Sequence, residues 1–555
     1  MESAGSSNQS VPPYVLHYAD QMFRDHEETF LDNPAALVEQ VRHAFPENVR
    51  RNWTPITSPL AAQYTDRPVL VRARCMVQDF LGAECYAASC EILEGGKKRN
   101  VSGALRDSYG GEELEITKVH HLASRYCYVM VEVPGCTEWF AKDWEGETKE
   151  EKKEECEDGE SESKKAKMAT PPQPVTSFVA KFTDEAAEGL KTNAVLEVYG
   201  ILSAHKLTKE MEDESTTSPT NIIGLPNLHV IHYEPFSGAL LSPETALAGT
   251  AFASSTAALS RLRSVLLECI GDGLAADYMA MHLLSTTYSR KEIALASLPL
   301  NVCGVRHSQP FIDIVETLMP RIRVLPMTSA ALSNDPFHSS KDYESNRLMQ
   351  GVFQVAHGTC LIMDELATPT GQRIDVRDHA ERNLSTLSKV ISEQKIDYDF
   401  GFYSCTFDVD ISVMVLSEER SRFMNTPYRV CVPPFPSPSS SPLRQLTKDE
   451  LRGIRMAIMH AKATLKDVSI SADIANAVKD AFVHLCCHRD YAEFLKGDNK
   501  AEILSRSLLL ARLVTALRGE TAMTLDAWLT TMRMEKRREQ QVDELFPVPV
   551  QETKN

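Results

Sequence analysis

The chain has 555 residues, of which 43% are hydrophobic and 25% charged, a composition typical of a globular protein with about three domains. No apolar run reaches the roughly 18 residues of a membrane helix, and the first residues lack the basic and apolar regions of a secretion signal, so we expect a protein of the cytosol or nucleus. The formal net charge of -18 argues against a general nucleic-acid binder, since phosphate neutralisation requires an excess of Lys and Arg.

Residues 1–65 are expected to form a helical arm. Asn33 and Pro34 supply a helix start, and apolar residues then recur at helical spacing until Pro46. From residue 66 to 241 the pattern changes to short β-rich runs, the clearest at residues 69–77, 126–133, 194–202 and 228–233. Several short strands separated by turns predict a small β-barrel of the OB (oligonucleotide-binding) type.

An acidic insertion at about residues 143–170 interrupts these strands. Between residues 143 and 162 there are 11 Asp or Glu against 3 Lys and almost nothing apolar, which predicts disorder because burial cannot offset the ordering entropy. Two groups of lysines in this region have the layout of a bipartite nuclear-import signal. The candidate import residues are Lys152, Lys153, Lys164, Lys165 and Lys167.

An OB barrel that binds single-stranded DNA needs exposed aromatic side chains on a basic groove. Five aromatic residues of this region do not alternate with Lys or Arg, apart from Arg125 beside Tyr126: Phe80, Tyr86, Tyr126, Tyr128 and Trp139. We therefore expect most of these aromatics to pack in the core and do not expect direct DNA binding. An OB-fold DNA-binding replication factor remains one alternative.

Residues 242–431 alternate helices with continuous apolar strands, which predicts a parallel α/β sheet. A strand at residues 300–305 precedes a second that ends in Asp364 and Glu365, an arrangement typical of the Walker B motif of P-loop ATPases. In a working ATPase, Asp364 would hold Mg²⁺ and Glu365 would activate the attacking water.

The phosphate loop that such a site requires is missing. A working loop has the pattern G-x-x-x-x-G-K-[ST], whose backbone amides and Lys bind the phosphates. Gly304 is followed by neither a Lys nor a second Gly, and Pro310 removes one amide. We expect no catalytic residues, no cofactor and no ATP hydrolysis, and we assign Asp364 and Glu365 a structural or interface role; a residual ATPase is the other alternative.

A Pro/Ser-rich linker at 432–442 leads into a helical domain at 443–541 and a tail at 542–555. Thr447 and Glu450 form a capping box that begins one helix, and Trp528 is predicted to face inward from the last. The basic residues 536–538 are typical of a solvated helix end.

His484, Cys487 and His488 share one helical face, but a structural zinc site needs four ligands. No Cys-x-x-Cys pair completes the set, so no metal is expected.

The strand at 300–305 and the later Asp364–Glu365 pair resemble the AAA+ module of the minichromosome maintenance (MCM) helicases. Residues 74–79, 298–302, 361–365 and 395–400 resemble more closely the MCM-binding protein family, a degenerate relative of those helicases, and they span most of the chain. Two sensor positions depart from the helicase pattern. Ser417 and Glu418 occupy the place of the first sensor, and Ser505, rather than Arg506, falls at the second-sensor arginine.

The resemblance implies an OB-like N-terminal domain, a degenerate AAA+-like parallel α/β domain and a C-terminal helical lid. It further implies a non-enzymatic partner of the MCM helicase subunits that acts as a chaperone, assembly or unloading factor in DNA replication. Roles in the cell cycle, cell division, mitosis and sister chromatid cohesion follow from the same resemblance. The protein would lie in the nucleus, with some cytoplasmic pool, and would associate with chromatin indirectly.

Overall fold

The computed structural model describes residues 13–58, 60–65, 67–94, 96–107, 115–145, 175–204, 225–236, 250–290, 297–345, 347–369, 379–424, 426–433, 438–491, 494–495 and 500–546. The chain divides into two compact units. Unit 1 comprises residues 1–134, 142–236 and 341–350, and unit 2 comprises residues 135–141, 237–340 and 351–555. In the sequence, the short segment 135–141 of unit 2 therefore interrupts unit 1, and the short segment 341–350 of unit 1 interrupts unit 2.

Unit 1 is built on a seven-stranded sheet whose two longest strands are β2 (Val69–Glu94) and β4 (Glu115–Glu132). The sheet also contains β1 (Thr54–Pro55), β3 (Lys97–Ser102), β5 (Ser177–Phe182), β6 (Val195–Ser203) and β7 (Asn227–Pro235). Strand pairing runs from β2 to β4, β5, β7 and β6, and β6 pairs again with β2. The four strands expected from the sequence are all present, and β2 and β4 are longer than predicted.

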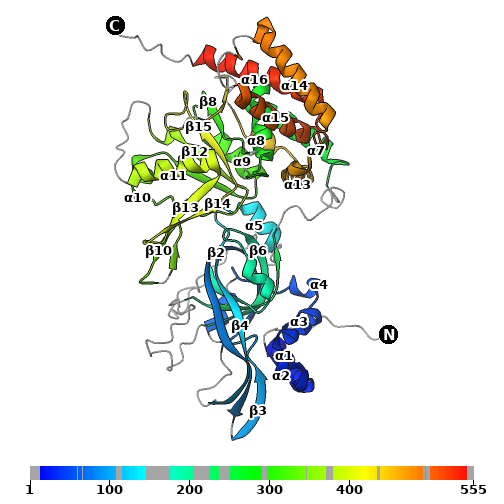
Figure 1. The fold of residues 1–555 in the computed structure, drawn as a ribbon, viewed down its shortest axis with the longest axis vertical. Helices are drawn as coiled ribbons and strands as arrows, with labels where there is room; N and C mark the ends of the chain where they lie inside the picture. Colours follow the sequence, from blue (N-terminus) through cyan, green and yellow to red (C-terminus); the bar gives the residue numbers. More distant parts are fainter. Residues whose placement is uncertain are drawn as a thin grey trace, which may run out of the picture. The chain divides into compact units, whose positions relative to one another are not determined.

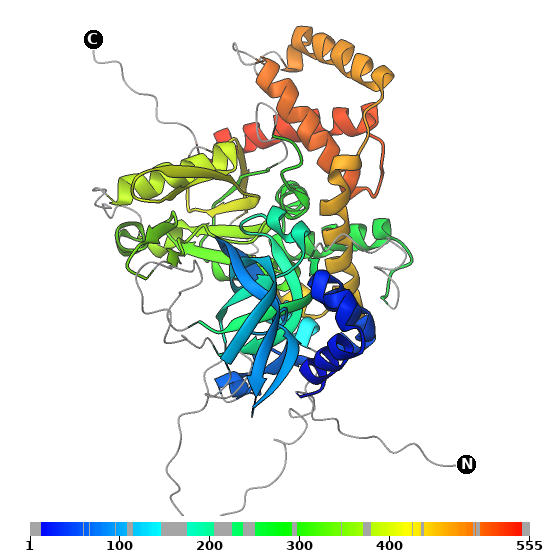
Figure 2. The same ribbon diagram turned by 60° about the horizontal axis from the view of Figure 1, so that its bottom comes forward.

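Four helices precede the sheet of unit 1. They are α1 (Pro13–Asp25), α2 (Glu27–Asp32), α3 (Pro34–Ala44) and α4 (Glu47–Arg50). Helices α1 to α3 lie along one side of the strands (Figures 1 and 2). Buried Val41 and Trp53 pack with Tyr199 of β6 in a core shared by helices and sheet. The helix predicted to start at Pro34 is confirmed.

A buried ionic network lies among the strands of unit 1 around Asp107. The Asp107 carboxylate accepts a hydrogen bond from the Arg125 guanidinium and another, at 2.8 Å, from the Lys181 ammonium. His229 Nε2 lies 3.2 Å from the other Asp107 carboxylate oxygen. Glu84 accepts from Arg125 at 3.1 Å. Arg125 and Lys181 are only 3% and 2% exposed, so both cations are neutralised inside the unit.

Unit 2 contains the predicted parallel sheet. Its strand order is β16 (Tyr428–Cys431), β8 (Leu300–Cys303), β15 (Ile411–Leu416), β12 (Thr359–Asp364) and β9 (Ile322–Pro326). All the neighbouring strands are parallel. Helices α7 (Ser255–Ile270), α8 (Gly273–Leu284), α9 (Gln309–Leu318), α10 (Ser329–Asn334) and α11 (His379–Glu393) belong to the same unit. Apolar residues of α7, α8, α9 and the strands form its main core, as their continuous apolar runs predict.

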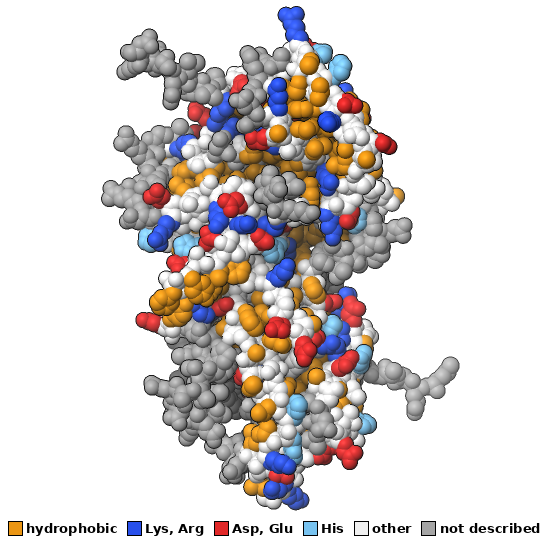
Figure 3. Space-filling model, in the orientation of Figure 1, with side chains coloured by type: hydrophobic (Ala, Val, Ile, Leu, Met, Phe, Trp, Pro, Cys, Tyr) orange, Lys and Arg blue, Asp and Glu red, His pale blue; other side chains and the backbone are white. Residues whose placement is uncertain are grey.

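A β-hairpin that the sequence analysis did not assign lies between α11 and β15. Its strands are β13 (Lys395–Asp399) and β14 (Ser404–Asp408), which pair antiparallel. Phe402 and Tyr403 at its tip are 93% and 59% exposed, and Phe400 stacks on Tyr403 with ring centroids 5.1 Å apart. Figure 3 shows hydrophobic side chains gathered where Figure 1 places the end of these strands.

The C-terminal part of unit 2 is helical, as predicted. It contains α12 (Ser441–Arg444), α13 (Lys448–Thr464), α14 (Ala472–Cys487), α15 (Lys500–Leu517) and α16 (Leu525–Leu545). Both hydrogen bonds of the capping box between Thr447 and Glu450 are present, and Trp528 is fully buried. One expectation is wrong: Arg538 is not part of a solvated helix end but is buried against Glu535, because it lies on the same face of α16 as Trp528.

The segment 135–141 packs entirely within unit 2. The Ile322 amide donates to the Gly135 carbonyl at 2.8 Å, which extends edge strand β9. Trp139, in the first turn of α5 (Glu138–Glu145), donates to the Glu316 carbonyl at 2.9 Å and lies under the Arg455 guanidinium at 3.9 Å. This segment therefore belongs to the α/β sheet region of unit 2, although its neighbours in the sequence belong to unit 1.

The complementary segment 341–350 belongs to unit 1 and includes the end of β10 (Ser340–Asp342) and all of β11 (Arg347–Met349). Gln78 donates to the Leu348 carbonyl at 3.0 Å, and Lys341 pairs with Asp79 at 3.0 Å.

Among the described residues, no helix combines the length and apolar composition that crossing a membrane requires.

Candidate functional site

The Asp364–Glu365 pair lies where β12 ends, at the carboxyl edge of the parallel sheet that α/β proteins use for ligands. Asp364 accepts a hydrogen bond from the Leu366 amide at 3.0 Å and so caps the short 3-10 turn Glu365–Ala367. One Asp364 carboxylate oxygen therefore caps the turn that follows β12, in agreement with the structural role expected for this residue.

Glu365 is 2% exposed and is held by the loop that follows β15. The Ser421 hydroxyl and the Arg422 amide both donate to its carboxylate, the amide at 3.0 Å. The Arg422 guanidinium donates to the carbonyls of Glu365 and Thr368 at 3.1 and 3.0 Å. Burial raises the pKa of Glu365, although these hydrogen bonds oppose the shift. The position that would activate water is occupied by the protein's own donors.

The turn after β8 is closed in the same way. Residues 304–308 separate β8 from α9, and they contain neither the Lys nor the second Gly of a phosphate loop. The Gly304 amide donates to the Glu418 carbonyl at 3.1 Å, and the Val305 amide donates to the Ser417 carbonyl at 3.0 Å. Gly304 has a φ of 81°, and a Cβ there would lie 2.8 Å from the Val432 carbonyl oxygen. The first two amides that could cradle a phosphate therefore bind backbone oxygens instead.

The end of α16 also covers this edge of the sheet. Phe546 packs in a cluster with Cys303, Cys431 and Val542. Arg420 donates to the Phe546 carbonyl at 2.9 Å and pairs with Asp543 at 2.7 Å. The space between Glu365, Ser417 and Arg422 measures about 50 Å³, enough for a few water molecules but far below the roughly 300–1,000 Å³ of ligand sites.

The two sensor positions have ordinary structural partners. Ser417 is buried and accepts from the Asn301 side chain at 2.8 Å, which ties β15 to β8. Arg506 lies 3.8 Å from Glu502 one helical turn away, and Ser505 is exposed. Neither contact resembles a nucleotide sensor, and neither could have been recognised without the fold.

The remaining candidates are the lysines of the import signal and the His and Cys residues near position 484. Lys152, Lys153, Lys164, Lys165 and Lys167 lie outside the described residues. Within the part of the chain that the structure describes, no group of three His, Cys, Asp or Glu side chains is placed to hold a metal ion, and this includes the neighbourhood of His484 and Cys487.

Replacing Glu365 with Gln is expected to lower the free energy of unfolding by about 1–3 kcal/mol. The two carboxylate oxygens of Glu365 each accept a hydrogen bond, and in Gln one of them is replaced by an amino group that cannot accept. Thermal unfolding and ATP turnover should be measured together on the purified chain. We expect a lower melting temperature and turnover at background before and after the substitution. Turnover above background that Glu365→Gln abolishes would contradict this account.

Comparisons with known proteins identify the family of this chain. The family model described as mini-chromosome maintenance replisome factor matches residues 41–154 and 142–542. The chain is 25% identical to the mini-chromosome maintenance complex-binding protein of Salmo salar, over 92% of this chain and 94% of that protein. The proteins of the same name in Homo sapiens and Arabidopsis thaliana are 24% and 25% identical, over 90% and 91% of this chain and 93% of each relative. The chain belongs to the mini-chromosome maintenance replisome factor family.

Proposed function

We propose that the chain is a non-enzymatic binding partner of the MCM complex and acts in DNA replication as an assembly chaperone or unloading factor. Its relatives are named for binding that complex and align along nine tenths of the chain. The observation that carries the proposal is the closed nucleotide site, in which Glu365 and the amides of Gly304 and Val305 are bound to the protein itself. A helicase-like sheet without a nucleotide site is suited to pairing with helicase subunits without building an ATP site.

The proposal also includes the domain organisation, the cellular role and the location of the protein. Unit 1 would be an OB-like module, residues 242–431 a degenerate AAA+-like module and residues 443–541 a helical lid. A role in sister chromatid cohesion and a nuclear location with a cytoplasmic pool belong to the proposal as well. The pairing of the buried side chains of Arg125 and Lys181 with partly buried carboxylates supports a protein-binding rather than a DNA-binding unit 1, because these two cations cannot reach phosphate.

The surface that we assign to this contact is the tip of the β13–β14 hairpin. Phe402 is the most exposed large hydrophobic side chain among the described residues, and the stacked pair Phe400 and Tyr403 fixes its turn. Exposed aromatics on a rigid turn are typical anchors of protein interfaces. The hairpin lies within residues 242–416, and we expect this α/β region, rather than unit 1, to carry the contact with helicase subunits.

The test uses the full chain, since deleting residues 1–240 would also remove the segment 135–141 from unit 2. Replacing Phe402 and Tyr403 with Ser should weaken recovery of MCM subunits from nuclease-treated nuclear extract about tenfold or more. Leu122→Ser is the matched control, because Leu122 is 64% exposed but lies in unit 1. Equal recovery by the tip variant and wild type would place the contact elsewhere, and loss of recovery on nuclease treatment would indicate a DNA bridge.

Nuclear entry is predicted to use Lys152, Lys153, Lys164, Lys165 and Lys167. Changing all five to Ala should shift a fluorescently tagged chain toward the cytoplasm, because import receptors read clustered positive charge. The melting temperature should not change, since the segment is predicted to contribute no packed core. Unchanged nuclear fluorescence would show that another signal, or a bound partner, carries the protein in.

A further inference from the structure

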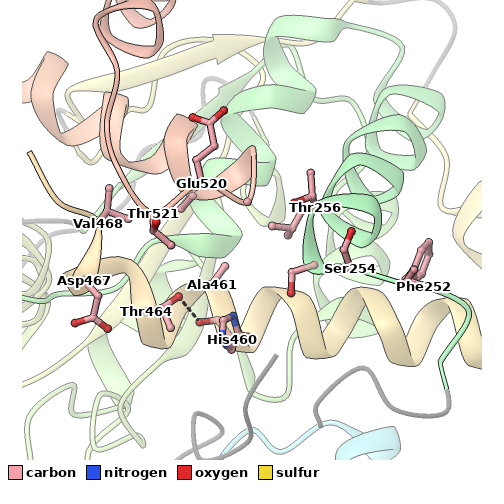
Figure 4. Close-up of a pocket in the computed structure, with 15 residues that line it drawn as sticks. Phe252, Ser254, Thr256, His460, Ala461, Thr464, Asp467, Val468, Glu520 and Thr521 are labelled. Atoms are coloured by element: carbon pink, nitrogen blue, oxygen red, sulfur yellow. Dashed lines mark hydrogen bonds between the residues drawn. The ribbon is translucent and has the colours of Figure 1, made fainter. Parts of the chain in front are cut away.

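Unit 2 contains a pocket of about 650 Å³, well within the size range of ligand sites and remote in sequence from the closed nucleotide site. Its walls come from the start of α7, the end of α13 with the turn that follows, and the loop between α15 and α16 (Figure 4). Helix α13 crosses the pocket and contributes His460, Ala461 and Thr464.

The floor of the pocket is apolar and its walls are rich in hydroxyl groups. Leu259, Ala461, Val468 and Ala516 are buried and line it. Five further lining residues carry hydroxyl groups: Ser254, Ser255, Thr256, Thr464 and Thr521. The Ser254 hydroxyl already accepts from the Ala257 amide at 3.2 Å, and the Thr464 hydroxyl already donates to the His460 carbonyl at 2.9 Å. Because a hydroxyl both donates and accepts, Ser254 can still donate to a peptide carbonyl and Thr464 can still accept from a peptide amide. The combination matches a peptide that places one aliphatic side chain on the floor.

The rim of the pocket is acidic. Figure 4 shows Asp467 and Glu520 at its edge, and both are exposed. Neither forms an ion pair with any of the described residues, whereas nearby Arg518 is paired with Asp526. Burial lowers the pKa of His460, which disfavours a positive charge on its imidazole beside the two carboxylates. This charge favours a cationic ligand and disfavours phosphate or nucleic acid.

The pocket is preformed. Gly519 ends α15 with a φ of 72°, and a Cβ there would lie 2.3 Å from Thr256 Oγ1, so the loop packs directly on α7. The Ser469 amide donates to the Thr521 carbonyl and the Met523 amide donates to the Ser469 carbonyl, both at 2.9 Å. These contacts hold three walls together without a ligand, which limits the entropy lost on binding.

We infer that this pocket docks a segment of the MCM complex that presents a Lys or Arg beside an aliphatic residue. The aliphatic side chain would lie on Ala461 and Leu259, and the cation would pair with Asp467 or Glu520 at the rim. The inference rests on the proposed function and adds a second contact, separate from the β13–β14 hairpin.

The experiment measures binding of purified full chain to purified MCM complex by biolayer interferometry. The double variant Asp467→Lys, Glu520→Lys reverses the rim, and Thr464→Trp fills the pocket. Asp480→Lys, Glu544→Lys is the matched control, since both carboxylates are exposed, unpaired among the described residues and outside the pocket. Melting temperatures identify any variant that fails to fold. The rim residues are exposed, so their reversal should leave folding intact.

We expect at least tenfold weaker binding by the rim and filling variants, a change below twofold for the control, and a weaker salt dependence for the rim variant than for wild type. A photo-crosslinking residue at position 464 should capture an MCM peptide containing Lys or Arg. If wild type binds and both pocket variants bind equally well, the pocket inference is wrong and the proposed function stands. Failure of wild type to bind would overturn the proposed function itself, and capture of a second copy of this chain at position 464 would reassign the pocket to self-association.

Discussion

Replacing Arg538 with Ala is expected to lower the free energy of unfolding of unit 2 by about 3–5 kcal/mol, because it leaves a buried carboxylate without its cation. Arg538 donates to Glu535 at 2.8 and 3.1 Å, and the two side chains are only 4% and 6% exposed. The Tyr278 hydroxyl of α8 donates to the same carboxylate. The triad therefore fastens α16 to the helices that cover the sheet.

Thermal unfolding of the purified chain measures this effect, with Arg537→Ala as the control. Arg537 is the adjacent residue of α16 and is exposed, so its loss should change stability by no more than about 0.5 kcal/mol. The double variant Glu535→Leu, Arg538→Met should recover much of the loss, since replacing a buried pair with apolar residues is often neutral. Equal stability of the two single arginine variants would contradict the burial of Arg538.

Replacing Asp107 with Asn is expected to destabilise unit 1 by about 3 kcal/mol or more at pH 7, because Arg125 and Lys181 remain buried with one carboxylate fewer. Burial alone would raise the pKa of Asp107, but His229, Arg125 and Lys181 outweigh it and lower that pKa well below its usual range. A carboxyl group whose pKa is lower in the folded than in the unfolded state stabilises the fold above its unfolded pKa of about 3.9.

The difference in stability between wild type and Asp107→Asn should therefore be full at pH 7 and shrink as the pH falls below about 5. Hydrogen exchange of peptides from β2 and β4 measures unit 1 separately from unit 2. Asp25→Asn is the control, because Asp25 is exposed at the end of α1. A difference that is independent of pH between 7 and 3 would show that the Asp107 carboxylate is not the stabilising group.

The parallel sheet and the C-terminal helices could be predicted because their signals are local. Strands β8, β12 and β15 are continuous apolar runs, and the capping box of Thr447 and Glu450 marks a helix start within four residues. The missing Lys and second Gly after Gly304 likewise predicted that no phosphate loop would form. These features depend on residues that are close together in the sequence, so they can be recognised from the sequence alone.

Other features depend on contacts between distant residues. Nothing near Trp139 indicates that its segment pairs with β9 nearly two hundred positions later, since the hydrogen bond from Ile322 involves backbone atoms. The donors that close the Glu365 site come from a loop after β15 with no recognisable motif. The buried position of Arg538 could have been found, because Trp528, Glu535 and Arg538 recur at helical spacing, but charge alone indicated a solvated end.

The central claim is our proposal that this chain, in which donors of the protein itself occupy Glu365, binds the MCM complex directly. Size-exclusion chromatography with light scattering of the purified chain mixed with purified, nuclease-treated MCM complex tests it, in parallel runs with and without ATP. We predict co-elution in both runs, because Glu365 and the amides of Gly304 and Val305 bind the protein's own groups, and we propose that the contact with the MCM complex does not use a nucleotide. Separate elution in both runs, or co-elution that requires ATP bound to this chain, would contradict the account.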